Sequence, residues 1–574
     1  MSAKKSVASS LKNPVFSSDD AESRALVTDE YLGDQSSSSV NNDLNSILKQ
    51  ITKDSTPVSS KALKLGFPEE KDDECEDMQL FLNRRKHFFI LSSAGKPIYS
   101  MHGSEDIIVG YMGLIQTIVS YFHLEETAEA GIGTGDLRSF KNGDVCFTFE
   151  NRYPIILMGV SNMQETDVES TQQLDFLYNY LVTTLSKPHI NKVFRQRESF
   201  DFRKLLGHAD VACLNNICAD LANNSNLGLI IGGLPCLKVK RHIRVKLEQI
   251  LLRYTSPSVL YGLLLGPEGK LITVMRPRRH TLHTADLQLL FSMIFNTNTF
   301  KTSSTDKPEF QVNEEFWVPV CLPRFNSNGF LYAFIQFWQL QRDDALEKLG
   351  TGSADQSVNP DTTKMGLILL SPYKDQFYQV RDISKRIIDR IMESSTLYKE
   401  LYLSMLTNTP PEGICPLISD FIFKSKKHAQ YFLIKRDDDG EHERMLRYIY
   451  SRLHSAVVTN TLVSPQRSTK CNGENILQRK IITFDSSNFI KYTKWKVSSS
   501  QLEESFNMNA RISSSPQKND IVTGFVISTP SFELYMVRKG SDIDKKALAQ
   551  TSKKIIKWCL KNEGRLFVSG GAVF

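Results

Sequence analysis

Residues 86–103 decide the fold, and they read KHFFILSSAGKPIYSMHG. The apolar run over 86–93 predicts a buried strand. Ala94-Gly95-Lys96 is typical of a tight turn, and residues 96–103 predict a second strand that returns beside the first. The stretch therefore predicts an antiparallel hairpin at the start of a folded domain.

A helix is expected directly after this hairpin. Ser104 is suited to cap it, because a serine side chain accepts hydrogen bonds from the backbone amides of the first helical turn. Apolar residues recur at helical spacing over 107–122 and predict a face that packs on the sheet. Apolar segments at 146–150 and 153–161 predict further strands. The unit is therefore expected to be an antiparallel sheet flanked by helices, an α+β arrangement.

The same order of elements returns later in the chain. Residues 259–266 predict a strand, Pro267-Glu-Gly-Lys270 a turn, and 271–277 the returning strand. Thr284 can then cap a helix, and two more strand candidates follow at 316–322 and 329–338. The match in element order and turn chemistry indicates a duplicated fold, although a hairpin followed by a helix is common enough to recur by chance.

A chain of 574 residues is too long for one hydrophobic core. A third region begins near Ile414, with strand candidates at 420–425, 522–528 and 532–539 and a final helix. We therefore expect four segments: a disordered tail (1–85), a first domain with a helical extension (86–255), a second domain (256–410) and a third domain (411–574).

The expected tail is rich in Ser, Asp, Lys and Asn and has no sustained apolar pattern. Within it, Leu44, Ile47, Leu48 and Ile51 would form one apolar stripe on a short helix. That helix is either inert or a peptide that folds onto a partner or onto the body of this protein. Polar insertions at about 342–364, 463–476 and 498–520 predict flexible loops.

Composition excludes several classes of protein. The net charge of +6 is far from the dense basic surface of a non-specific nucleic-acid binder. The nine cysteines include no CxxC pair, which favours a reducing compartment, and Cys213, Cys218 and Cys236 are expected to be buried thiols rather than zinc ligands. The sequence predicts neither a signal peptide nor a membrane span.

No motif predicts a catalytic centre. Gly131-Ile-Gly-Thr-Gly135 lacks the preceding strand of a dinucleotide site, and Gly266-Pro-Glu-Gly-Lys270 lacks the spacing of a phosphate-binding loop. Asp437-Asp-Asp-Gly440 lacks the later ligands of a calcium loop, and His280 with His283 has no third metal ligand nearby. The chain is expected to be a binding protein without cofactor or metal, although a catalytic triad assembled from distant residues stays open.

Two clusters of cations are candidate anion sites. The first has six basic residues at helical spacing and favours a solvated helix face: Lys238, Lys240, Arg241, His242, Arg244 and Lys246. The second, at Arg276, Arg278, Arg279 and His280, lies in a loop between a strand and a helix, where side chains can converge on one phosphate. We expect it to contact anionic lipid rather than nucleic acid, because no aromatic residues are interleaved for base stacking.

Several stretches together resemble the Mon/SAND family. The most specific is the hairpin at 86–99 with Gly103-Ser104-Glu105, and weaker matches follow at 202–210 (FRKLLGHAD), 276–283 (RPRRHTLH), 532–535 (FELY) and 565–567 (RLF). The resemblance covers about residues 86 to 574. Met101-His102 departs from the arginine and aromatic residue that family members often carry there.

The resemblance implies three longin domains, each an antiparallel sheet flanked by helices, and a regulatory, phosphorylated tail. It also implies an obligate heterodimer with a Ccz-one-type tri-longin protein, and the pair would be a guanine-nucleotide exchange factor. Its substrate would be the late-endosomal and vacuolar Rab GTPase of the seventh subtype. The first longin domain would carry the GTPase or partner interface, for which the candidate residues are Lys96, Pro97, Tyr99, His102 and Ser104.

Family members also recognise an early-endosomal Rab and membranes that contain phosphatidylinositol 3-phosphate. The resemblance therefore implies a peripheral protein of late-endosomal, multivesicular-body, prevacuolar and vacuolar membranes, with a role in endosome and autophagosome fusion. No covalent chemistry is implied. A longin-type vesicle coat or tethering scaffold without exchange activity is the alternative.

Overall fold

The computed structural model describes most of the chain as three sheets with their helices. The residues described are 61–62, 81–82, 84–103, 105–128, 137–197, 200–296, 315–340, 363–406, 418, 420–434, 440–462, 488–497, 520–539 and 545–573. Several features discussed above lie outside these residues: the expected helix at 44–51, Ser104, the glycine string at 131–135 and Asp437 to Asp439. The predicted polar loops also lie outside them, apart from a few residues at their ends.

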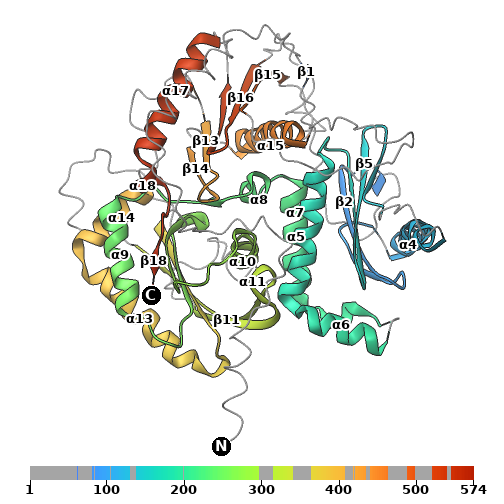
Figure 1. The fold of residues 1–574 in the computed structure, drawn as a ribbon, viewed down its shortest axis with the longest axis horizontal. Coiled ribbons are helices and arrows are strands. Elements are labelled where there is room, and N and C mark those ends of the chain that lie inside the picture. The colour runs from blue at the N-terminus through green and yellow to red at the C-terminus, as the bar shows by residue number, and fades with distance from the viewer. Residues whose placement is uncertain are drawn as a thin grey trace, which may run out of the picture.

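The first sheet has five antiparallel strands. In spatial order they are β3 (Pro97–Ser100), β2 (Lys86–Ser92), β6 (Ile155–Ser161), β5 (Val145–Arg152) and β4 (Ser139–Asn142). Helix α4 (Glu105–Ala128) covers one face, and α5 (Asp167–Leu185) and α7 (His208–Ala222) cover the other (Figure 1). The predicted hairpin and helix are confirmed.

The alternation of side chains along β2 explains these two layers. Phe88 and Ile90 pack among residues of α5 and α7, whereas Phe89 and Leu91 pack among residues of α4. Successive strand residues point to opposite faces of a sheet, so a continuous apolar run fits a strand that is buried on both sides. The turn needs Gly95, whose φ of +76° is in the left-handed region.

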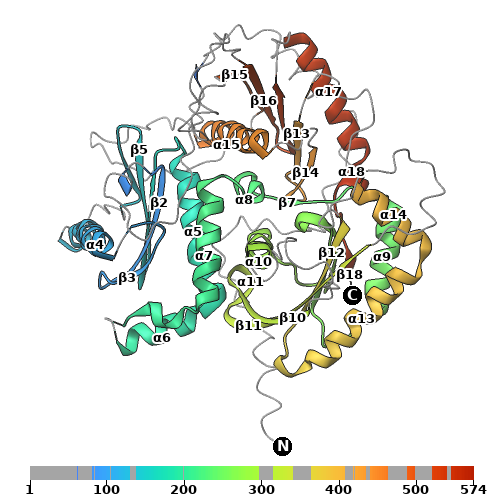
Figure 2. The same cartoon turned by 180° about the vertical axis from the view of Figure 1, so that it is seen from behind.

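The second sheet repeats the first with one added strand. Its order is β10 (Glu315–Leu322), β11 (Ser327–Gln339), β12 (Lys364–Ser371), β8 (Tyr261–Leu265), β9 (Leu271–Arg276) and β18 (Ala572–Val573). Helix α10 (Thr284–Asn296) covers one face. The other face is covered by α9 (Arg241–Arg253), α13 (Phe377–Glu393) and α14 (Ser395–Leu406) (Figure 2).

The third sheet has strands added at both ends. Its order is β1 (Lys61–Ala62), β15 (Phe489–Val497), β16 (Asp520–Ser528), β17 (Phe532–Lys539), β13 (Asp420–Ser425), β14 (Gln430–Ile434) and β7 (Leu234–Pro235). Helix α15 (Gly440–Leu462) packs on one face. Helices α17 (Lys545–Lys561) and α18 (Glu563–Leu566) contribute to the core on the other.

Short helices lie between the larger elements. They are α6 (Lys187–Gln196), η1 (Phe202–Leu205), α8 (Leu227–Ile231), η2 (Pro267–Gly269), α11 (Pro323–Asn326) and η4 (Lys374–Gln376). The turn η2 joins β8 to β9, as the Pro-Glu-Gly-Lys stretch predicts. The first unit contains a buried ion pair, in which Lys86 Nζ at the start of β2 lies 2.7 Å from Glu165 Oε2.

Two expectations need correction, and several elements were missed. Folded structure begins before Lys86, within the expected tail. Phe81 is only 3% exposed and packs in the core beneath α4, and β1 pairs with β15 of the third sheet. Helix α9, expected to extend the first domain, packs in the core of the second sheet instead. The apolar run of β12 and the helices α13 to α15 were not predicted, although their spacing is readable in the sequence.

Candidate functional site

The second strand of each hairpin (β3, β9 or β14) ends its sheet unless a further strand pairs with it, and the three sheets differ in this respect. Strand β18 pairs in parallel with β9 in the second sheet, and β7 pairs in parallel with β14 in the third. In the part of the chain that the structure describes, no strand pairs with the outer edge of β3. An unpaired edge presents backbone N–H and C=O groups to a partner strand.

The predicted interface residues of the first domain divide between surface and core. Lys96 is exposed in the turn, and Pro97 and His102 are half-buried. Tyr99 is only 7% exposed and lies in the core between the sheet and helices α5 and α7, where its hydroxyl interacts with the Cys218 thiol of α7. Tyr99 is therefore not available to a partner in this structure, because its position on β3 points its side chain inward.

Helix α4 supplies a surface that sequence reasoning missed. Its outer face carries small and apolar residues: Gly110, Gly113, Leu114, Thr117, Ser120 and Tyr121. Leu114 and Tyr121 are each 59% exposed, and a Cβ placed on Gly110 or Gly113 would meet nothing within 4 Å. The signal was present, since residues 107–122 contain no charged side chain. A helix that is apolar all round is normally buried on both sides.

The basic loop between β9 and α10 is split by burial. Arg276 is only 4% exposed, and its Nε donates a hydrogen bond to the Gly570 carbonyl at 3.4 Å. Arg278, Arg279 and His280 are exposed. Three of the four predicted lipid-binding residues are therefore exposed. Arg276 is not, because it is the last residue of β9 and is held beneath the C-terminal segment.

The first basic cluster is also divided. Arg241, His242 and Lys246 are exposed on α9, as predicted, and so is Lys240 just before it. Lys238 is half-buried, and Arg244 is only 4% exposed. Its guanidinium donates hydrogen bonds to backbone carbonyls of the second domain and the C-terminal segment, namely those of Ile272, Leu237, Gly564, Arg565 and Phe567. Arg244 therefore holds the C-terminal segment in place so that β18 reaches the edge of the second sheet.

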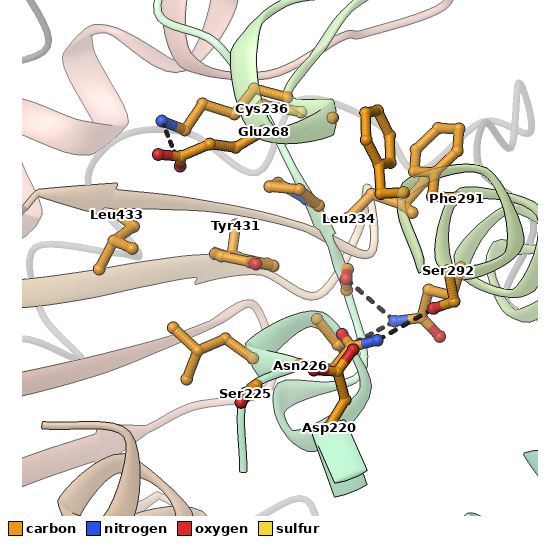
Figure 3. Close-up of a pocket in the computed structure, with 18 of the residues that line it drawn as sticks. Asp220, Ser225, Asn226, Leu234, Cys236, Glu268, Phe291, Ser292, Tyr431 and Leu433 are labelled. Atoms are coloured by element: carbon orange, nitrogen blue, oxygen red, sulfur yellow. Dashed lines mark hydrogen bonds and ion pairs between the residues drawn. The ribbon is translucent and has the colours of Figure 1, made fainter. Parts of the chain in front are cut away.

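A cavity of about 500 Å³ lies where the three domains meet (Figure 3). Its polar side chains are used to join elements: Asn226 Nδ2 donates to Ser292 Oγ at 3.1 Å, and Gln288 Nε2 donates to two backbone carbonyls of the α8 region. Burial raises the pKa of the Cys236 thiol to about 12, so this thiol is neutral and a poor nucleophile. The lining offers interdomain contacts rather than a nucleophile with its base.

Other candidate chemistry is sparse in the described residues. No group of three or more His, Cys, Asp or Glu side chains there could hold a metal ion. Cys213, Cys218 and Cys236 are buried, as predicted. His283 Nδ1 accepts a hydrogen bond from the Ala285 amide at the start of α10, which gives this histidine a structural role. None of the described helices is long and apolar enough to cross a bilayer.

Comparison with known proteins assigns all three units. Models of the first, second and third longin domains of FUZ, MON1 and HPS1 match residues 86–217, 257–389 and 417–563. The chain is 33% identical to the vacuolar fusion protein MON1 of Eremothecium gossypii over 86% of this chain and 81% of that protein. It is 34% identical to the MON1 protein of Saccharomyces cerevisiae over 85% and 72%, and 33% identical to that of Yarrowia lipolytica over 87% and 76%.

Proposed function

Because this chain belongs to the FUZ, MON1 and HPS1 family of proteins with three longin domains, we propose that it is one subunit of a heterodimeric guanine-nucleotide exchange factor. Its relatives are named vacuolar fusion proteins, which supports a role in vacuole fusion and in the traffic that leads to it. The proposed partner is a Ccz-one-type tri-longin protein. The proposed substrate is the late-endosomal and vacuolar Rab GTPase of the seventh subtype.

One observation carries the proposal: the first domain has both an unpaired β3 edge and an uncharged outer face on the neighbouring α4. Glycines at 110 and 113 let a second helix approach closely, and Leu114 and Tyr121 supply apolar area for it to bury. The corresponding edges of the second and third sheets are covered by β18 and β7. A partner longin domain is thus favoured at the first sheet.

The proposed activity needs no covalent step. A surface that binds the nucleotide-free GTPase more tightly than the loaded form weakens nucleotide affinity by the same factor, because binding free energies are linked around the cycle. The exposed Lys96 and the half-buried Pro97 and His102 lie beside the proposed dimer surface. They are the candidate contacts to the GTPase or to the partner. Nucleotide release would therefore depend on residues from two chains.

The test is release of a fluorescent guanine nucleotide from the vacuolar Rab, with this chain alone and then with its partner. Acceleration by the pair only is the expected result. Activity of this chain alone would contradict a surface shared by two chains. If a well-folded pair gave no acceleration, the exchange proposal would be rejected and a tethering or coat scaffold would remain.

Membrane recruitment is a second part of the proposal. Arg278, Arg279 and His280 are exposed in one loop, which suits contact with phosphatidylinositol 3-phosphate headgroups or another anionic lipid. Arg278→Glu with Arg279→Glu should weaken sedimentation with such liposomes and leave exchange in solution unchanged. Unchanged sedimentation would remove this loop from the lipid site. An early-endosomal Rab is the proposed upstream partner on the same membranes.

A further inference from the structure

A second candidate interface lies at the opposite end of α5 from the third domain, where α6 meets the second domain (Figure 1). An open groove of about 600 Å³ runs between α6 and the corner where α11 leads into β11. One wall is α6, which contributes Lys187, Pro188, Asn191, Lys192, Arg195 and Gln196. Ser327 and Asn328 form the other wall.

The groove follows from the pattern of α6. Ile190 and Phe194, four residues apart, are buried against the first domain. The polar residues of the helix must then face away from that core, and Lys187, Asn191 and Arg195 form a row at the same spacing of four. The helix has no acidic residue, so the row has a cation at each end, with the neutral Asn191 between them as a hydrogen-bond donor.

The cations of this groove are not used by the fold. Lys187, Lys192 and Arg195 are exposed and form no ion pair with any residue that the structure describes, and no acidic residue lines the groove. Lys187 also stands in the first turn of α6, where the positive end of the helix dipole disfavours a cation. Other exposed cations of this chain do form ion pairs within the fold: Lys240 pairs with Glu400, and Arg152 pairs with Asp175.

We infer that this groove binds an extended acidic peptide from another protein. The helical rise puts about 6 Å between residues four apart in the α6 row. Alternate side chains of an extended chain are separated by about 6.6 to 6.8 Å. Acidic residues at every second position of a peptide would therefore meet successive members of the row, while Ser327 and Asn328 could bond to its backbone.

A peptide is favoured over a membrane surface for two reasons. The site is hollowed between two walls, whereas a bilayer presents a flat plane. In addition, the large apolar side chains that are exposed in the described residues include none from α6 or α11, so the site offers nothing to insert among lipid chains. This interface is separate from the proposed exchange surface on α4 and β3.

The test measures binding of a fluorescein-labelled short peptide with Glu at alternate positions, using the full-length chain and fluorescence anisotropy. A peptide with Gln in place of Glu is the negative control. Lys187→Glu with Arg195→Glu, at the two ends of the row, should weaken binding by about tenfold or more, and Lys187→Ala with Arg195→Ala by a smaller factor. Both changes are at exposed helical positions, and alanine favours the helix, so α6 should still form.

The matched control is Lys385→Glu with Arg386→Glu on α13, where both side chains are exposed and the change in net charge is the same. This pair should leave peptide affinity within about twofold, because screening limits the reach of surface charges to about 10 Å. Equal loss in both double variants, or no loss in either, would overturn the inference. So would binding of acidic vesicles through α6 without binding of the peptide. Nucleotide exchange by the soluble heterodimer should be unchanged by the α6 variants, so the two proposals can fail independently.

Discussion

Replacing Gly113 by arginine should have opposite effects on the free chain and on its heterodimer. Gly113 is in the middle of α4, on the exposed face, and an added Cβ would meet nothing within 4 Å. Glycine is less favourable than arginine in a helix interior by about 0.5 to 1 kcal/mol. Gly113→Arg should therefore leave the free chain as stable as before or stabilise it by up to about 1 kcal/mol.

The same change should block the proposed partner. Val109, Leu114 and Tyr121 are 54%, 59% and 59% exposed, so a partner helix could bury about half of each side chain. Complete burial of such a side chain contributes about 1.5 to 3 kcal/mol, so the three together would supply about 2 to 5 kcal/mol. An arginine at 113 would hold the helices apart and forfeit this contribution, which corresponds to about a thirtyfold or larger loss of affinity.

The assay combines thermal unfolding of the free chain with calorimetric titration of the partner and the nucleotide-release measurement. Gln172→Arg, at an exposed position on α5 away from α4, is the control for added charge. Unchanged partner affinity in Gly113→Arg would refute the assignment of this face. A clear loss of stability in the free chain would refute it too, since the face would then already be covered within the molecule.

Two further predictions concern the interior. Arg244→Met leaves several buried backbone carbonyls without a donor, so it should lower the free energy of unfolding by about 3 kcal/mol or more in urea titrations. The control is Arg241→Met at an exposed position of the same helix, which should change that free energy by less than about 0.5 kcal/mol. Burial alone would raise the pKa of Glu533, but Lys424 and His454 outweigh it and lower the pKa to about 2. Because the unfolded value is about 4.3, the stability that this carboxylate contributes is present above that pH and is lost as the pH falls towards 2. Glu533→Gln should flatten this part of the stability profile, and a profile as steep as that of the unchanged chain would contradict the assignment.

Much of the first domain could be predicted from local sequence. The run from Lys86 to Ser92 is apolar over a strand length, Gly95 supplies a turn that needs positive φ, and the helix after it has apolar residues at a helical period. Each of these signals depends only on residues that are close in the sequence, so it can be recognised without knowledge of the tertiary structure. The repeated hairpin in the second domain was predicted for the same reason.

The exposure of the candidate site residues was predicted only in part. Lys96, Arg278 and Arg279 are exposed, as expected for residues in turns and loops. Tyr99 and Arg276, in contrast, are buried. Both buried residues belong to strands, where the face of a side chain depends on the register with the neighbouring strand. No local pattern distinguishes a tyrosine that faces a partner from one that faces the core of its own domain.

The sequence by itself determined the first two hairpin-and-helix units and the lack of a recognisable catalytic motif. Only the tertiary structure decided which edges are open: Leu234 and Pro235 close the third sheet, and Ala572 and Val573 close the second. These strands are two residues long and pair with segments far away in the chain. Their pairing is fixed by the packing of whole domains and by buried groups such as Arg244, so no short-range pattern encodes it. The open edge of β3 is therefore a property of the assembled fold.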